Sequence, residues 1–123
     1  MVATGPGGIF GIGVDVVDLA RFERTLERTP ELRDRLFRPD EAGLTLERLA
    51  VRFAAKEAFV KALRSPAGLS WQDVEVVSDD AGAPELLLHG AAADRVADLG
   101  IRRVHVSLSH DTSVATAFVV AEC

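Results

Sequence analysis

Cysteine is nearly absent from this sequence: Cys123 is the only one among 123 residues. A single cysteine excludes an intramolecular disulfide framework and a cysteine metal cluster, and it suits a reducing environment, so we expect a cytoplasmic protein. Long apolar runs are missing too. None approaches the roughly 18 residues that cross a bilayer, and we expect no membrane association. Residues 1–8 have neither the basic nor the apolar region of a secretory signal, and we expect them to be a flexible leader.

Several common catalytic motifs are also absent. The sequence has no G-x-S-x-G, no H-E-x-x-H, no G-x-x-x-x-G-K-[ST], and no G-x-G-x-x-G that opens a helix after a strand. Hydrolases with a nucleophile elbow, zincins and P-loop enzymes are therefore disfavoured. The net charge of −5 argues against general nucleic-acid binding, so an anionic partner must meet a local basic patch.

The length is that of one domain, and we expect residues 9–123 to form it. Periodicity and turn residues predict a strand at 9–17 and helices at 19–28, 30–37, 39–43 and 46–63. The second half is predicted to contain a hairpin of strands 74–77 and 85–88, a helix at 91–99, and strands 103–109 and 114–120. This order predicts an α+β class, with a helical N-terminal half whose long central helix packs on an antiparallel sheet.

The long helix at 46–63 contains charges at unusual positions. Its apolar residues recur three or four apart at Leu46, Leu49, Ala50, Phe53 and Val60. At about 100° per residue, Glu57 falls within this stripe and Lys61 falls on its edge, so we expect both charges on the core side. A buried charge costs several kcal/mol unless it is paired or bound to a metal. Two interpretations are open: a structural Glu57–Lys61 pair, or a metal or phosphate site on the inner face.

The predicted first strand has two different faces. Ile12, Val14 and Val16 alternate onto one side, and Gly11, Gly13 and Asp15 onto the other. The glycines remove side chains and let another backbone or a ligand come close. Asp15 is either a strand-end residue bonded to a turn or a ligand in a cleft. If the long helix packs across this strand, Asp15 and Glu57 can provide the one or two carboxylates that Mg²⁺ needs.

The helix predicted at 19–28, which Asp18 can cap, carries a row of arginines. The arginines are three and four residues apart and share a face: Arg21, Arg24 and Arg28. This row is either a solvated face interleaved with glutamates or a docking ridge for an acidic partner.

Three segments resemble the motifs of a known family. They are GIGVDVVDLARF at 11–22, RFAAKEAFVKAL at 52–63 and HVSLSHD at 105–111. Their order and spacing resemble those of the holo-acyl-carrier-protein synthases, the short type of 4′-phosphopantetheinyl transferase, over about 9–122. The middle segment is the most specific. The resemblance implies a transferase fold and an enzyme of fatty-acid or polyketide biosynthesis, which moves 4′-phosphopantetheine from coenzyme A to a serine of an apo acyl carrier protein and releases 3′,5′-ADP.

The resemblance also assigns catalytic roles to residues. Asp15 and Glu57 match the ligands of an Mg²⁺ ion that bridges the coenzyme A pyrophosphate, and Lys61 matches the lysine that contacts the phosphate. Displacement at phosphorus calls mainly for positioning and charge neutralisation, which a cation and an ammonium group can supply. Deprotonation of the attacking serine falls either to Glu57 or to a metal-bound water.

Substrate contacts are implied at other positions. Arg52, Ser109 and His110 lie where the family binds the nucleotide end of coenzyme A. Many members have a Gly-Thr-Gly turn after the long helix, whereas this chain has residues 64–68, RSPAG. Only Gly68 can bring a backbone close to the phosphate or pantetheine there. The family docks carrier proteins on its first helix, which assigns Arg21, Arg24 and Arg28 to docking.

Short members of the family resemble trimers with a site at each subunit boundary. We therefore expect a homotrimer in which the apolar C-terminal strands form the contact. Two alternatives are open: another Mg²⁺-dependent nucleotide transferase, or a catalytically silent trimeric module that binds carrier proteins. The altered turn after the long helix is the feature that favours the silent module.

Overall fold

The computed structural model describes residues 7–123. Of the predicted leader, residues 1–6 lie outside this range. Gly7 and Gly8 are bonded to the C-terminal residue: Gly7 N–H donates to the Cys123 carbonyl and Cys123 N–H to the Gly8 carbonyl, both at 2.8 Å. The boundary at residue 9 stays a prediction. Within the described range, no helix is long and apolar enough to span a membrane.

Helices dominate the first half of the chain and strands the second, as predicted. The first half contains β1 (Ile9–Asp18), α1 (Leu19–Arg28), α2 (Leu32–Leu36), α3 (Pro39–Ala42) and α4 (Leu46–Ala62). The second half contains the 3₁₀ turn η1 (Trp71–Asp73), β2 (Val74–Ser78), β3 (Pro84–Leu88), α5 (Gly90–Asp98), β4 (Arg103–His110) and β5 (Val114–Glu122). Strand β5 pairs antiparallel with β1 and β4, and β2 pairs with β3 as a separate hairpin. The predicted α+β class is confirmed.

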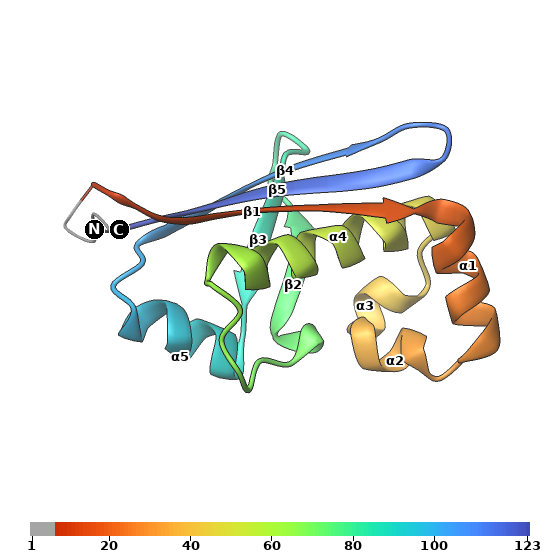
Figure 1. Cartoon of the computed structure of the whole chain (residues 1–123), viewed down its shortest axis with the longest axis horizontal. Helices are drawn as coiled ribbons and strands as arrows, with labels where there is room; N and C mark the ends of the chain where they lie inside the picture. The colour runs from red at the N-terminus through yellow and green to blue at the C-terminus, as the bar shows by residue number, and fades with distance from the viewer. Residues whose placement is uncertain (1–6) are drawn as a thin grey trace.

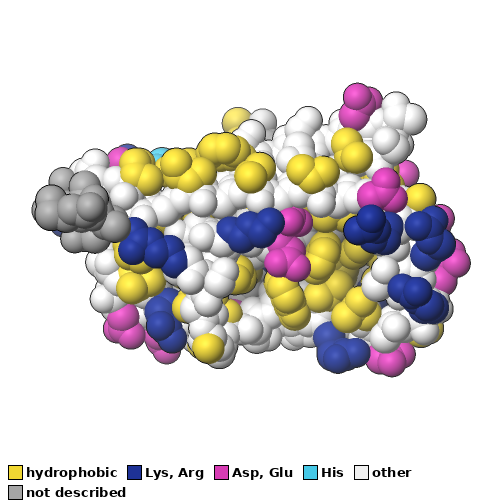
Figure 2. All heavy atoms as spheres, viewed as in Figure 1, with side chains coloured by type: hydrophobic (Ala, Val, Ile, Leu, Met, Phe, Trp, Pro, Cys, Tyr) yellow, Lys and Arg dark blue, Asp and Glu magenta, His cyan; other side chains and the backbone are white. Residues whose placement is uncertain are grey.

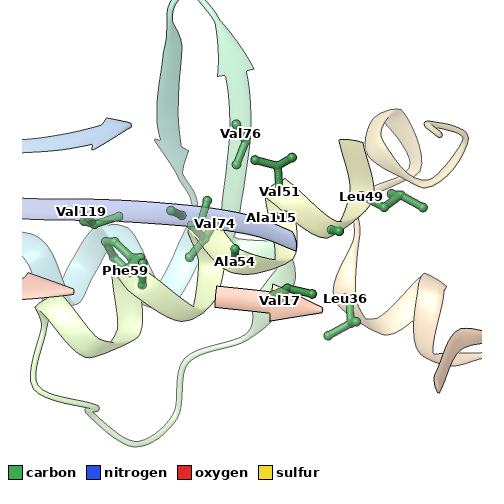
Figure 3. Close-up of a cluster of buried hydrophobic side chains, with 14 of the residues drawn as sticks. Val17, Leu36, Leu49, Val51, Ala54, Phe59, Val74, Val76, Ala115 and Val119 are labelled. Carbon is green, nitrogen blue, oxygen red and sulfur yellow. The ribbon is translucent and has the colours of Figure 1, made fainter. Parts of the chain in front are cut away.

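Helix α4 runs along the three-stranded sheet and forms the centre of the core (Figure 1). Its side chains Leu49, Ala54 and Phe59 are completely buried, and Ala54 and Phe59 lie beside Val74 of β2 and Val119 of β5 (Figure 3). Since residues from both sheets contact this one helix, its position fixes the relative positions of β1 and the β2–β3 hairpin.

Two glycines let β1 lie directly against α4. A methyl group added at Gly11 would overlap the carbonyl oxygen of Ala62, and one added at Gly13 would overlap that of Ala58. Side chains are therefore excluded at these two positions of the strand. The prediction that another backbone comes close at these glycines is confirmed.

Gly13→Ala is expected to lower the free energy of unfolding by about 1–3 kcal/mol, because the strand and the helix must move apart to admit the methyl group. Gly43→Ala is the matched control: Gly43 has an ordinary φ of −87° and nothing within 4 Å of the added carbon. Urea unfolding of both variants measures the difference. Equal stability of the two variants would contradict the close packing of β1 on α4.

The predicted core face of α4 is only part of its buried surface. The helix is buried nearly all round, largely through the alanines at 50, 54, 55, 58 and 62. In the predicted stripe, Leu49 and Ala50 are completely buried, whereas Phe53 and Val60 are half-buried, and the Lys61 side chain at its edge is 49% exposed. Alanine is only weakly hydrophobic, so a helix that is packed tightly through alanines has an apolar pattern that understates its buried surface.

The outer face of the three-stranded sheet is apolar and exposed. Ile12, Val14 and Val16 of β1 are 56%, 50% and 65% exposed, and Phe118, opposite Val14 on β5, is 47% exposed. Hydrophobic side chains form a row along this edge of the molecule (Figure 2). The predicted alternation of β1 is confirmed, with its β-branched side turned away from α4.

Candidate active site

Asp15 and Lys61 meet where β1 crosses α4. The Lys61 Nζ donates to Asp15 Oδ1 at 2.9 Å and to the Val14 carbonyl at 3.0 Å. The side chain of Asp15 is 17% exposed. The ion pair of Lys61 is therefore with Asp15, so the interpretation of Glu57 and Lys61 as a structural pair with each other is wrong.

Glu57 lies on the same face of α4, one turn before Lys61, and is half-buried. Burial raises the pKa of its carboxyl group, the nearby charge of Asp15 raises this pKa further, and the Lys61 ammonium partly opposes the rise. Within residues 7–123, no side-chain hydrogen bond or ion pair satisfies this carboxylate. Asp15 and Glu57 are thus neighbouring carboxylates with the Lys61 ammonium nearby, and a cation near both would relieve their repulsion.

Both carboxylates line a cavity of about 430 Å³ between α1, α2 and α4. Its walls are largely apolar: Phe22 stacks on Phe53 with ring centroids 5.3 Å apart, and Phe53 packs on Trp71 at 5.8 Å. Figure 2 shows this hydrophobic hollow between acidic side chains over α4 and basic side chains over α1. A ligand in this cavity would contact carboxylates on one side, aromatic rings at its base and the arginine side chain of α1 at its edge.

The two carboxylates fit a hard divalent cation. In the described part of the chain, no cluster of three or more His, Cys, Asp or Glu side chains could hold a metal ion. A protein cage of the kind that binds Zn²⁺ is therefore not formed by these residues. Mg²⁺ accepts one or two protein carboxylates and takes its other ligands from water and phosphate, so Asp15 and Glu57 suit it.

The arginine row borders the same cavity. Asp18 caps α1 as predicted, because its carboxylate accepts from the Arg21 backbone N–H at 2.9 Å. Arg21, Arg24 and Arg28 are all exposed on α1, and Arg21 also lines the cavity. The positive charges thus begin at the cavity and extend away from it along the helix.

Comparison with known proteins decides the family. Residues 11–117 match the model of the 4′-phosphopantetheinyl transferase superfamily. The chain belongs to this superfamily. The holo-[acyl-carrier-protein] synthase of Clavibacter michiganensis is 57% identical over 114 residues, which cover 93% of this chain and 96% of that protein.

Solved structures agree with this assignment. The crystal structure of holo-[acyl-carrier-protein] synthase from Neisseria meningitidis is 36% identical, covers 94% of this chain and 99% of its own, and superposes with a TM-score of 0.84. The Helicobacter pylori enzyme, solved in complex with coenzyme A, is 31% identical, covers 89% of this chain and 98% of its own, and has a TM-score of 0.79. The predicted family, fold and enzyme class, that of a holo-[acyl-carrier-protein] synthase, are confirmed.

The predicted nucleotide contacts of the transferase lie elsewhere in the chain. Arg52 lines a different cavity with Arg48 and Leu108, and Ser109 and His110 are exposed at the end of β4. Burial lowers the pKa of Arg52. The negative charge of Glu41 opposes this decrease, and the positive charge of Arg48 lowers the pKa further. The Nε of Arg52 is buried and has no hydrogen-bond partner among the described residues. None of these three residues lines the cavity of Asp15 and Glu57.

The turn after α4 has an unusual backbone. Arg64 and Ser65 have φ angles of 64° and 54°, values that favour glycine, and Gly68 has 86°. Arg64 is held by its side chain, which donates to the Phe10 carbonyl at 2.8 Å and lies 4.3 Å above the Phe10 ring. Gly68 lines a small cavity of about 120 Å³ beside Val60 and Trp71. Gly68 is therefore adjacent to the main cavity, with Trp71 between them.

Sequence reasoning missed a buried charge next to Glu57. Lys56 is 0% exposed, and its Nζ donates to Glu41 Oε1 at 2.9 Å and to the carbonyls of Trp71 and Val74. Burial lowers the pKa of Lys56, and the hydrogen bond and charge of Glu41 oppose this shift. The sequence held one signal of this burial. Lys56 is seven residues from both Leu49 and Leu63 and therefore lies on the same side of the helix as these two leucines, but the small alanines around it make that side look weakly hydrophobic.

Proposed function

We propose that the transferase moves 4′-phosphopantetheine from coenzyme A to a serine of an apo acyl carrier protein, releases 3′,5′-ADP and requires Mg²⁺. The observation that carries this proposal is that Asp15 and Glu57 line the same cavity as Arg21, with the Lys61 ammonium bonded to Asp15. The relatives named holo-[acyl-carrier-protein] synthase and the coenzyme A complex of the Helicobacter pylori enzyme support the substrates. A buried, free Cys123 is consistent with a cytoplasmic location.

The reaction forms a bond between the serine oxygen and phosphorus and breaks the bond from that phosphorus to the bridging oxygen, which leaves on 3′,5′-ADP. Asp15 and Glu57 would hold the cation, which when bound neutralises pyrophosphate charge. Lys61, anchored on the Val14 carbonyl, places an ammonium group for the transferred phosphate. Glu57 is the carboxylate of this chain that we propose to accept the serine proton, since it lines the cavity beside Asp15.

One assay tests the proposal. The protein is incubated with coenzyme A, Mg²⁺ and an apo acyl carrier protein, and the carrier is weighed by mass spectrometry. A gain of one phosphopantetheine that a chelator abolishes supports the proposal. If the mass of none of several carriers increases, the proposal is wrong and the silent carrier-binding module becomes the better interpretation. If a carrier gains the mass of a different group, the protein is another nucleotide transferase.

If the carrier docks on α1, reversing the charge of an arginine on this helix should weaken docking. Arg21→Glu is expected to raise KM for the carrier by about tenfold, because a rim charge that steers an acidic partner becomes repulsive, with KM for coenzyme A nearly unchanged. Arg95→Glu, an equally exposed arginine on α5, is the matched control. An unchanged carrier KM for Arg21→Glu would remove Arg21 from the docking surface.

We also propose a homotrimer whose active sites lie at subunit boundaries. The exposed apolar face of β1 and β5 supports an interface, and a neighbouring chain can supply the Arg52, Ser109 and His110 that a single chain keeps away from Glu57. Specific interfaces of this kind bury apolar surface that monomers rarely expose.

Phe118→Lys is expected to convert the trimer to single chains of 13.2 kDa and to abolish transfer, because a charge in an apolar interface lacks a partner. Light scattering after size exclusion measures the mass. Leu87→Lys, which changes an equally exposed residue of the β2–β3 hairpin, is the control. A fully active wild-type monomer would contradict the trimer.

A further inference from the structure

A buried ion pair lies behind the active cavity and has no part in the proposed reaction. Lys56 is 0% and Glu41 2% exposed, and their charged atoms are 2.9 Å apart. Glu41 comes from α3 and Lys56 from α4, 15 residues later. The second carboxylate oxygen of Glu41 accepts from the Val76 N–H of β2 at 3.2 Å. The pair therefore connects two helices and the first strand of the hairpin.

The geometry of this pair is more informative than its contribution to stability. Well-packed apolar residues replace a buried ion pair with little or no loss of stability, so stability alone does not explain two charges here. What an apolar pair lacks is directional donors. Lys56 gives two of its hydrogens to backbone carbonyls, that of Trp71 at 3.1 Å and that of Val74 at the start of β2.

The Trp71 carbonyl belongs to η1, the short turn that carries the indole into the active cavity. The indole packs on Phe53, which stacks on Phe22 of α1, and all three rings line the cavity that contains Glu57. Trp71 also lines the smaller cavity beside Gly68, so it borders both cavities. A shift of η1 would change the shape of both cavities.

Two other part-buried hydrogen bonds hold the same turn. Arg38 Nη1 donates to the Gln72 carbonyl at 2.8 Å, and the Gln72 side chain donates to the Phe37 carbonyl at 3.3 Å. These bonds act one residue after Trp71. Among the described residues, Lys56 is the side chain that bonds to the backbone of Trp71 itself, and Lys56 is completely buried.

We propose that the Lys56–Glu41 pair is a positioning device that holds η1 in place, so that Trp71 completes the apolar wall of the cavity that Asp15, Glu57 and Arg21 also line. This role rests on the proposed function in one respect: a carrier docked on α1 must cross this wall to bring its serine to Glu57. Lys56 and Glu41 touch neither substrate; they act through Trp71.

The test uses the full-length Glu41→Gln/Lys56→Met variant. Lys56→Met alone leaves a buried unpaired carboxylate and can fail to fold, whereas the double variant keeps shape and removes both charges and the donors to Trp71. Trp71 is the only tryptophan of the chain, so intrinsic fluorescence reports on its position alone. Dissociation constants for apo carrier and for coenzyme A are measured separately. Val119→Ala, a completely buried change on β5, is the control for lost stability.

The double variant is expected to shift Trp71 emission to longer wavelength and to raise the carrier dissociation constant about tenfold, with that of coenzyme A unchanged. Val119→Ala is expected to lower the melting temperature with neither effect. An unchanged Trp71 spectrum in the folded double variant would overturn the proposal, and so would an equal shift in Val119→Ala. If the wild type binds no carrier, the proposed function is wrong. The positioning role is then tested by the Trp71 emission of the double variant alone.

Discussion

Glu57→Gln is expected to lower kcat for phosphopantetheine transfer by about 10³-fold, equivalent to about 4 kcal/mol of transition-state stabilisation. The amide has nearly the shape of the carboxylate but carries no charge to share a cation with Asp15 and accepts no proton from the serine. Initial rates from the mass of the carrier, at saturating coenzyme A and Mg²⁺, measure the effect. Glu47→Gln makes the same change in the exposed first turn of α4 and is expected to leave kcat unchanged.

The stability of Glu57→Gln shows whether Glu57 has a catalytic or a structural role. The pKa of Glu57 is raised in the folded protein, so the fold disfavours the ionised form, and wild-type stability is gained as pH falls through that pKa. Above it, the ionised carboxylate opposes folding when no cation is bound. Glu57→Gln in a chelating buffer is therefore expected to be at least as stable as wild type at neutral pH. A lower melting temperature for the variant would mean that Glu57 serves mainly to hold the fold.

The helices and strands were predictable because local signals were clear. The alternation of Ile12, Val14 and Val16 defines β1, and Asp18 caps α1 with the hydrogen bond expected of it. The pairing of Asp15 with the charged face of α4 was also predictable, since two glycines on β1 admit a helix. These features depend on residues close in the chain or on a single clear packing rule.

The rotational setting of α4 was not predictable from hydrophobic spacing. Alanine adds little to a hydrophobic pattern, yet the sheet and hairpin pack against the alanine-rich sides of this helix. The stripe through Phe53 and Val60 thus faces the cavities. Lys56 was missed for a related reason: lysine is rarely buried without a partner, and its partner Glu41 lies across a turn with no periodic relation to it.

Lys56→Met is expected to lower the free energy of unfolding by about 3–5 kcal/mol, a large part of the 5–15 kcal/mol typical of a domain. The change leaves the Glu41 carboxylate buried without a cation and removes the donor from the Trp71 and Val74 carbonyls. Urea unfolding, monitored by circular dichroism, measures the loss. Lys61→Met removes an exposed ammonium one turn and a half later on the same helix and is expected to change stability by no more than about 1 kcal/mol.

Adding Glu41→Gln to Lys56→Met distinguishes two causes of this loss of stability. If the unpaired carboxylate dominates, adding Glu41→Gln to Lys56→Met restores most of the stability, because no buried charge remains. If the lost donors to the two carbonyls dominate, the double variant stays close to the single one, since each buried unsatisfied group costs about 1–3 kcal/mol. We expect the first outcome, because an uncompensated charge is costlier to bury than a carbonyl. A single variant as stable as wild type would contradict the burial of the pair.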